Sequence, residues 1–533
     1  MYFRNFSLAA LVSAIASGVW YYQDLFPGKR PVSASIPSLT TTQNIPTSTS
    51  STTATIPISI PQADETATVS DEVSPNVGAP IAVDDENFFL AEIDAETPLV
   101  KQVETDGATR MENVTPEQAT KKLRELEQSY SIGRGRGVVR YDMVQIPSNN
   151  PIEDDHAEKI VEIPQTVTPA KDGAATSDWM FWGVFDGHSG WTTSAKLRQK
   201  LISYVARELN VVHKSALADP KLNVPSPQAV DEAIKRGFVK LDYDIIHASV
   251  QKVLANKTKT ASTEILAPAL SGACALLSFY DSSSKLLRVA CTGDSRAVLG
   301  RKGSAGKWVA TPLSEDQTGG TPSEMARLRK EHPGEPDVVL NGRILGGLEP
   351  SRAFGDAAYK WTRDLQTQIR KHFFGRSPAA RLKSPPYVTA EPIVTTTKIE
   401  PENGDFVVLA TDGLWEMLTN EEVIGLVGRW LEKQKSPSTD SGPIAWAKTL
   451  AGRSDTQQLP VERLRIVPQS EEGQRAPVRQ EQWSVTESDE RFVTEDKNVA
   501  THLVRNALGG RDRDLVCSLL SLVSPYSRRY RYA

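Results

Sequence analysis

Short apolar runs recur between glycine and aspartate turns through the middle of the chain. They are rich in β-branched and aromatic residues, a pattern typical of buried strands. The runs are WMFWGVF at 179–185, ACALLSFY at 273–280, LLRVAC at 286–291 and DFVVLA at 405–410. Amphipathic helical patterns lie between them, at 193–209, 227–254, 322–331 and 420–434. The two patterns together predict an α+β fold in which helices cover sheets.

The N-terminal part of the chain has a different pattern, with one uncharged apolar run at 6–22. The run follows Arg4 and ends in three aromatic residues, and its length is at the lower limit for a helix that spans a bilayer. We therefore expect residues 1–30 to act as a single membrane anchor. A cleaved secretory signal and part of a transit sequence are the alternatives.

Low-complexity sequence separates this run from the predicted strands. Residues 31–114 are interpreted as a linker, because their first part is rich in Ser, Thr and Pro and has no hydrophobic period. Thr115 and Pro116 have the features of an N-cap and a first helical position, so ordered structure is expected to start there. The predicted domain spans 115–531, and its Pro-, Ser-, Gln- and Glu-rich segment at 435–497 indicates a disordered insertion.

Composition and charge exclude several classes of protein. The chain has 61 Lys and Arg against 66 Asp and Glu, a formal net charge of -5, so we expect no nucleic-acid partner. Three cysteines are too few and too scattered for a disulfide framework or a closed zinc site. An apolar content of 39% excludes fibrous and polytopic membrane proteins.

Acidic turns directly follow three of the apolar strands. These turns are Asp186-Gly187-His188, Gly293-Asp294 and Asp412-Gly413. A single Asp-Gly pair is usually an ordinary turn. Three such turns after buried strands, together with the acidic pair Glu153-Asp154, favour a group of converging carboxylates. Hard oxygen ligands without cysteine suit Mg²⁺ or Mn²⁺.

An ordered set of motifs gives a specific resemblance. The motifs are GVFDGHSG (183–190), LSGACALL (270–277), TGDSRAVL (292–299), LSEDQT (313–318), RILGGLEPSRAFGD (343–356) and VLATDGLWE (408–416). In this order they resemble the metal-dependent protein phosphatase 2C family. The segments PSNNPIEDD, ATHLVRNALGG and SPYSRRYR are most similar to its mitochondrial pyruvate dehydrogenase phosphatase branch, in the fungal form.

The resemblance implies a fold and a reaction. The fold would be two stacked antiparallel sheets flanked by helices, an α-β-β-α sandwich. The reaction would be hydrolysis of phosphoserine and phosphothreonine in proteins with two catalytic Mg²⁺ or Mn²⁺ ions and a weaker third one. The branch implies the pyruvate dehydrogenase E1 alpha subunit as substrate and, with the predicted anchor, a location at the mitochondrial inner membrane.

Metal-binding roles follow from the resemblance residue by residue. Asp186 would bridge both ions, the Gly187 carbonyl would complete one of them, and Asp412 would bind the other. Glu153 and Asp154 would act mostly by holding metal-bound waters.

The remaining roles also come from the resemblance. Asp294 and Asp356 match acidic positions associated with the third ion or with orienting the site. His188 matches the general acid that protonates the leaving seryl oxygen, after hydroxide produced at the two ions attacks phosphorus without a phosphoenzyme.

Phosphate binding departs from the usual family pattern. Most members have an arginine four residues before the acidic pair, whereas this chain has Asn149, as the pyruvate dehydrogenase phosphatase branch does. We expect Asn149 to give weak help to the metals. The nearby arginines Arg134, Arg136 and Arg140 are candidates to assist, and a flexible surface loop is the alternative interpretation of that segment.

The C-terminal sequence departs from the pattern as well. In the family the segment like SPYSRRYR continues into an Asp-Asp pair, which contributes a metal ligand, and then into a last strand. Here it is followed by Tyr532-Ala533. We interpret this as a truncated gene model that lacks the last strand. The alternative is a catalytically impaired protein that binds phosphoproteins.

Overall fold

The computed structural model describes residues 81–82, 113–164, 176–219, 221–222, 224–256, 258–435, 458–463, 488–524 and 526–531. The predicted anchor at 1–30 lies outside these residues, as does almost all of the linker predicted at 31–114. Among the helices that are described, none has the length and apolar character needed to cross a membrane.

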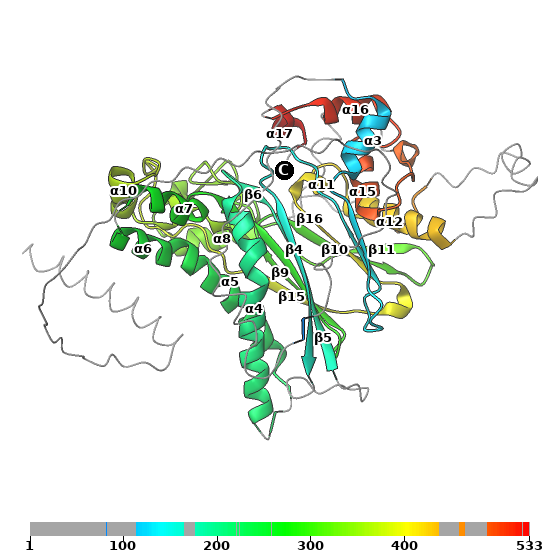
Figure 1. The fold of residues 1–533 in the computed structure, drawn as a ribbon, viewed down its shortest axis with the longest axis horizontal. Helices are drawn as coiled ribbons and strands as arrows, with labels where there is room; N and C mark the ends of the chain where they lie inside the picture. The colour runs from blue at the N-terminus through cyan, green and yellow to red at the C-terminus, as the bar shows by residue number, and fades with distance from the viewer. Residues whose placement is uncertain are drawn as a thin grey trace, which may run out of the picture. The chain divides into compact units, whose positions relative to one another are not determined.

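A sheet of six strands forms the centre of the domain (Figure 1). Its order is β1 (Ile81–Ala82), β4 (Asp155–Pro164), β5 (Thr176–Phe185), β8 (Ala275–Asp281), β9 (Leu286–Thr292) and β15 (Ile393–Lys398). All neighbours are antiparallel except β1, which pairs parallel with β4. The apolar run in β5 is continuous because both faces of the sheet are covered: Trp179, Met180 and Phe181 are all fully buried.

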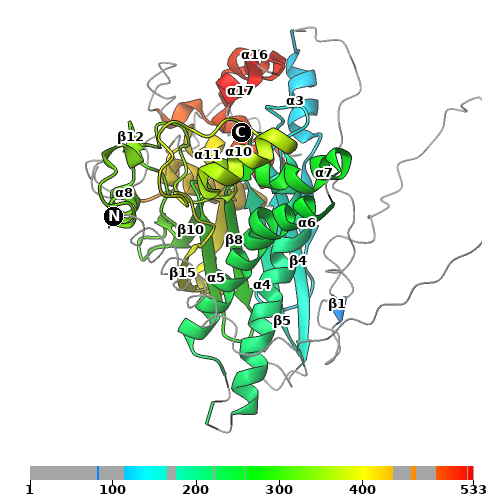
Figure 2. The ribbon, with the colours of Figure 1, turned by 90° about the vertical axis from the view of Figure 1, so that its left-hand side faces the viewer.

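Helices cover the outer face of this sheet. They are α4 (Thr192–Ala218), α5 (Pro227–Tyr243), α6 (Ser249–Asn256) and α7 (Lys259–Leu270), with a π-helical turn at Asp244–Ala248 that divides the helix predicted at 227–254. Figure 2 shows α4 and α5 lying across the sheet. Trp179 and Phe181 point into the core on this side, where Phe181 stacks on Phe279 with ring centroids 4.9 Å apart.

A second sheet packs on the inner face of the first. It contains β11 (Trp308–Pro312), β10 (Arg296–Lys302) and β16 (Phe406–Ala410), all antiparallel. Ala297 and Leu299 of β10 face the first sheet and share a buried cluster with Met180. Val298, between them in sequence, faces outward into a cluster with Ile424.

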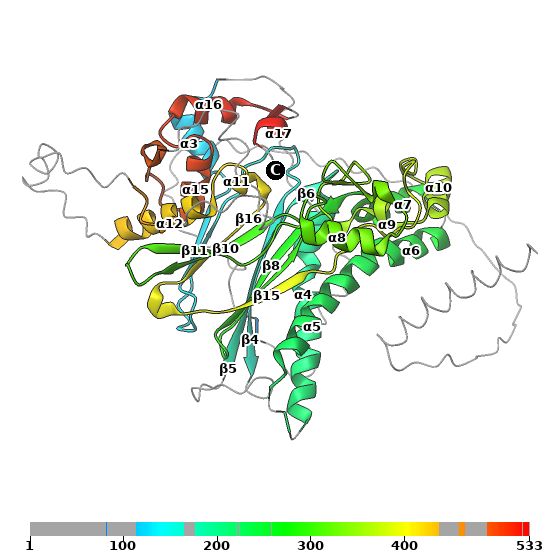
Figure 3. The ribbon, with the colours of Figure 1, turned by 180° about the vertical axis from the view of Figure 1, so that it is seen from behind.

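Two helices cover the far side of the second sheet, namely α12 (Asn420–Lys435) and α15 (Val499–Ala507). The succession of helices, sheet, sheet and helices can be followed in Figure 3. The predicted α-β-β-α sandwich is therefore confirmed.

Smaller elements complete the domain. A three-stranded sheet joins β14 (Phe354–Gly355), β7 (Gly272–Ala273) and β6 (Gly187–His188). The others are α3 (Pro116–Arg124), β2 (Gln128–Ser131), β3 (Arg140–Met143), α8 (Pro322–Glu331), η2 (Pro336–Val338), β12 (Val339–Leu340), β13 (Arg343–Ile344), α9 (Ala357–Lys360), α10 (Arg363–His372), η3 (Pro401–Asn403), α11 (Asp412–Trp415), η4 (Asp489–Arg491), α16 (Arg513–Ser521) and α17 (Tyr526–Arg531). The N-cap expected at Thr115 is confirmed, because its side chain accepts from the Gln118 amide in a capping box.

Part of the predicted insertion at 435–497 is packed rather than solvated. Backbone hydrogen bonds join Trp308 to Pro460 (2.8 Å) and to Glu462 (2.7 Å), so this segment extends the edge of β11. Leu459 is buried against α12, where Gly425 leaves room for it. The prediction of disorder is therefore wrong for residues 458–463, and also for 488–497, where Phe492 and Asp496 are buried. A Leu and a Val spaced by two residues are too short a pattern to reveal a strand.

We expect Leu459→Ala to lower the free energy of unfolding by about 2–5 kcal/mol, because it leaves a cavity in a packed cluster. Leu222→Ala is the matched control, since that side chain is half-exposed at 51% and should change stability by no more than about 0.5 kcal/mol. Equilibrium unfolding in urea measures both. Equal small effects would show that the segment does not pack on the sandwich.

Candidate metal centre

Three aspartates from separate strand ends meet at one edge of the sandwich. Asp186 follows β5, Asp294 lies in the turn between β9 and β10, and Asp412 begins α11 directly after β16. One carboxylate oxygen of each lies within 4.8 Å of the others. The carboxylates that the acidic turns predicted to converge are therefore brought together.

The electrostatics of this group favour a counter-charge. Burial raises the pKa of Asp186 well above its usual range, and the charges of Asp154, Asp412 and Asp294 raise it further. Burial and the charge of Asp412 raise the pKa of Asp294 to about 7. Carboxylates this close repel one another strongly in a poorly solvated site, and a divalent cation between them removes that repulsion.

The acidic pair Glu153-Asp154 clamps the turn after Asp186. The Gly187 amide donates to Asp154 Oδ1 at 3.2 Å, and the Gly190 amide donates to Glu153 Oε1 at 2.8 Å. A Cβ on Gly187 would lie 2.0 Å from the Glu153 carbonyl oxygen, so only glycine permits this contact. Both carboxylates border the group of three without belonging to it.

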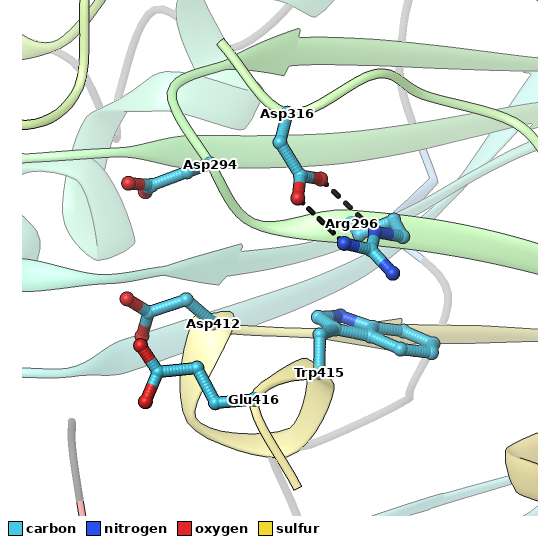
Figure 4. Close-up of a pocket in the computed structure, with 6 residues that line it drawn as sticks. All are labelled: Asp294, Arg296, Asp316, Asp412, Trp415 and Glu416. Atoms are coloured by element: carbon cyan, nitrogen blue, oxygen red, sulfur yellow. Dashed lines mark hydrogen bonds and ion pairs between the residues drawn. The ribbon is translucent and has the colours of Figure 1, made fainter. Parts of the chain in front are cut away.

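A small pocket opens beside Asp294 and Asp412 (Figure 4). Its wall is the buried pair Arg296–Asp316, with Nε to Oδ1 at 3.0 Å and Nη2 to Oδ2 at 2.5 Å. The Arg296 guanidinium also lies 5.1 Å from the centre of the Trp415 ring.

Glu416 lines the same pocket, and Figure 4 shows its carboxylate beside that of Asp412. The sequence interpretation missed Glu416. Its position four residues after Asp412 in VLATDGLWE was the available signal, because that spacing puts two side chains on one face of a helical turn.

His188 lies on β6 and is paired with a distant aspartate. Its Nε2 is 2.7 Å from Asp356 Oδ2. Burial lowers the pKa of His188, but the charge and hydrogen bond of Asp356 outweigh burial and leave the pKa above its usual value. The resemblance implied the same roles for Asp356 and Asp294. In the structure Asp356 pairs with His188, whereas Asp294 belongs to the group of three carboxylates.

Asn149 lies beside the acidic pair, because its Nδ2 donates to Glu153 Oε2 at 2.9 Å. This contact puts Asn149 next to the predicted site. The hydrogen bond to Glu153 by itself explains the orientation of the Asn149 amide.

The three arginines proposed to assist phosphate binding are engaged elsewhere. Arg134 donates to Asp178 (2.6 Å) and Arg136 to Thr176 (2.7 Å). Asp178 precedes Asp186 by eight residues of extended chain, about 26 Å at roughly 3.3 Å per residue. Arg140 pairs with Asp142 at 2.8 Å and lies over the Trp430 ring. These contacts argue against a phosphate-binding role for Arg134 and Arg136. Local sequence does not show which carboxylate an arginine will meet.

Three close carboxylates at the edge of an α-β-β-α sandwich form a site of the kind that divalent metal ions prefer. Comparison with known proteins identifies the family. Residues 156–444 match the family model described as Protein phosphatase 2C.

Three curated relatives agree. Pyruvate dehydrogenase (acetyl-transferring)-phosphatase 1, mitochondrial, of Saccharomyces cerevisiae is 42% identical over 82% of this chain and 76% of its own length. A protein phosphatase 2C homolog of Schizosaccharomyces pombe is 40% identical, covering 77% of this chain and 82% of its own. The human mitochondrial pyruvate dehydrogenase phosphatase 1 is 29% identical, covering 78% and 81%. The chain belongs to the protein phosphatase 2C family of metal-dependent protein serine/threonine phosphatases.

We expect Asp316→Ala to destabilise the domain by about 3–5 kcal/mol, because it leaves the Arg296 guanidinium buried without its anion. Asp364→Ala, an exposed position on α10, is the matched control and should change stability by about 0.5 kcal/mol or less. Thermal or urea unfolding of both variants measures the difference. A loss at Asp316 no larger than at Asp364 would contradict a structural role for the pair.

Proposed function

We propose that this chain dephosphorylates phosphoserine and phosphothreonine in the pyruvate dehydrogenase complex, with the E1 alpha subunit as substrate. The relative from Saccharomyces cerevisiae supports the substrate, because its name specifies pyruvate dehydrogenase and the similarity extends over most of both chains. The observation that carries the chemistry is the group of three aspartate oxygens within 4.8 Å of one another.

The donor set fits two Mg²⁺ or Mn²⁺ ions, and a third ion that would bind more weakly at the same site. It consists of carboxylate oxygens with an excess of negative charge, which hard divalent cations prefer. Asp186 would bind both ions, the Gly187 carbonyl would complete one of them, Asp412 would hold the other, and Asp294 the third. When bound, the ions would supply an activated water and neutralise the phosphate.

The residues around the group would do the rest of the work. Glu153 and Asp154 would hold and orient ordered water through hydrogen bonds. His188 would donate a proton to the seryl oxygen as it leaves. Asn149 would contact a phosphate oxygen with its amide, as a weak addition to the charge of the ions.

We propose a mitochondrial location, which the names of the relatives from yeast and human support. Inner-membrane anchoring by residues 1–30 stays a prediction from the apolar run at 6–22, which lies outside the described residues.

Asp186→Asn should lower phosphate release by more than about 100-fold, because losing a direct ligand exceeds the roughly 10- to 100-fold effect of an outer-shell partner. The measurement is Mn²⁺-dependent phosphate release from phosphorylated pyruvate dehydrogenase complex. Asp364→Asn, on the exposed face of α10, is the matched control and should keep full activity. Unchanged turnover in Asp186→Asn would remove the proposed site. Turnover absent from the unaltered chain would favour the phosphoprotein-binding alternative.

Metal affinity should fall as pH is lowered from 8 to 6. The raised pKa of Asp294, about 7 without metal, means that protons compete for this carboxylate below pH 7, whereas above it the ionised form is free to bind. For each proton that the metal must displace, the apparent Mn²⁺ affinity falls by up to about tenfold when the pH is lowered by one unit. Calorimetric titration at pH 6, 7 and 8 measures this dependence. Asp294→Asn should flatten it, and a pH-independent affinity in the unaltered chain would contradict the assignment.

A further inference from the structure

Asp356 is directed at His188 rather than at the metal-binding carboxylates. Its Oδ2 lies 2.7 Å from His188 Nε2, and its side chain is 9% exposed. Within the part of the chain that the structure describes, the group of close carboxylates contains Asp186, Asp294 and Asp412 without Asp356. The pairing joins residues 168 positions apart, so the fold rather than local sequence creates it.

The three-stranded sheet of β14, β7 and β6 builds this contact. Gly272 of β7 is the register partner of both His188 and Gly355, the residue before Asp356. A Cβ on Gly272 would lie 2.1 Å from His188 Nε2 and 2.4 Å from Asp356 Oδ2. A glycine at the centre of the sheet therefore leaves the space in which the two side chains meet.

The backbone at Asp356 is held in a conformation that a non-glycine residue seldom adopts. Its φ is 52° and its ψ 44°, in the left-handed region. Such strain persists where the surroundings enforce it, and it is concentrated at functional sites. The Asp356 amide donates to the Ser271 carbonyl at 2.8 Å. The Gly355 amide donates to Asp242 Oδ1 at 3.0 Å, and Asp242 is itself paired with Lys360.

We propose that Asp356 is the positioning residue for His188. The inference rests on the proposed function, in which His188 protonates the leaving seryl oxygen. Asp356 accepts a hydrogen bond from Nε2–H of His188 and so fixes the plane of the ring. Nδ1 is then the ring nitrogen that is left for the substrate.

The proton donated in the reaction is then the one on Nδ1. A water molecule gives one of its protons to solvent as its oxygen bonds to phosphorus, and the P–O bond to serine breaks with its electron pair going to the seryl oxygen. That oxygen takes the Nδ1 proton. The ring becomes neutral, keeps its Nε2 hydrogen bond to Asp356, and regains a proton from solvent water.

Leaving-group dependence tests this role, because proton donation matters most when the leaving oxygen is basic. We compare phenyl phosphate, a poor leaving group, with p-nitrophenyl phosphate, a good one. Asp356→Asn should lower kcat for phenyl phosphate by about 10- to 100-fold and for p-nitrophenyl phosphate by less than about threefold. Mn²⁺ affinity measured by calorimetry should stay within about twofold. Asp364→Asn should change none of these quantities.

A double variant separates positioning from other roles. In the His188→Gln background, Asp356→Asn should cause no further loss on phenyl phosphate, since it acts through His188. A further multiplicative loss, an equal loss on both substrates, or weaker Mn²⁺ binding would each overturn the proposal. If Asp356→Asn does not fold, Asp356→Ser serves as the second variant with the same expectations.

The failure of the underlying function gives different results. If His188→Gln alone slows both substrates equally, His188 is not the proton donor and the acid assignment fails. If Asp186→Asn keeps its activity, the metal site itself is wrong. Only the positioning proposal fails if His188→Gln and Asp186→Asn behave as expected but Asp356→Asn does not slow phenyl phosphate selectively.

Discussion

The repulsion among three close carboxylates, two of them buried and one half-buried, is the constraint on which the site depends. Two unit charges 4 Å apart interact by about 4 kcal/mol at the effective dielectric constant of roughly 20 that suits protein sites. One oxygen each of Asp186, Asp294 and Asp412 lies within 4.8 Å of the others, and Asp186 and Asp294 are buried. The folded chain holds them together because their backbones are fixed by strands, so the unfavourable charge is available to bind divalent cations.

The two sheets must be packed correctly for this group to exist. Asp186 comes from the first sheet, Asp412 from the second, and Asp294 from the turn that joins them. A shift of one sheet over the other would separate the carboxylates. The buried side chains between the sheets, such as Met180 and Leu299, therefore set the spacing of the metal ligands as well as the stability of the domain.

The strands and the acidic turns that follow them could be predicted from the sequence, because local residue patterns indicate both. An apolar run followed by Asp-Gly specifies a buried strand and the turn at its end, and this was enough to find Asp186 and Asp412. The contact between His188 and Asp356 could not be predicted in this way. It depends on strands of two residues each, and on a glycine whose role is clear only when three segments meet. The partners of Arg134 were likewise decided by long-range packing.

The commitment of the arginines has a consequence for how phosphate is recognised. Arg134 and Arg296 are each bound to a buried aspartate, and a bound guanidinium could reach a substrate only by leaving that carboxylate without its partner. Asn149 offers no charge, and its amide is held by Glu153. Under the proposed function, the negative charge of a phosphoserine would then be balanced mainly by the cations that the aspartates would bind. Substrate affinity and metal affinity would therefore be thermodynamically linked, because each bound partner would lower the electrostatic cost of the other.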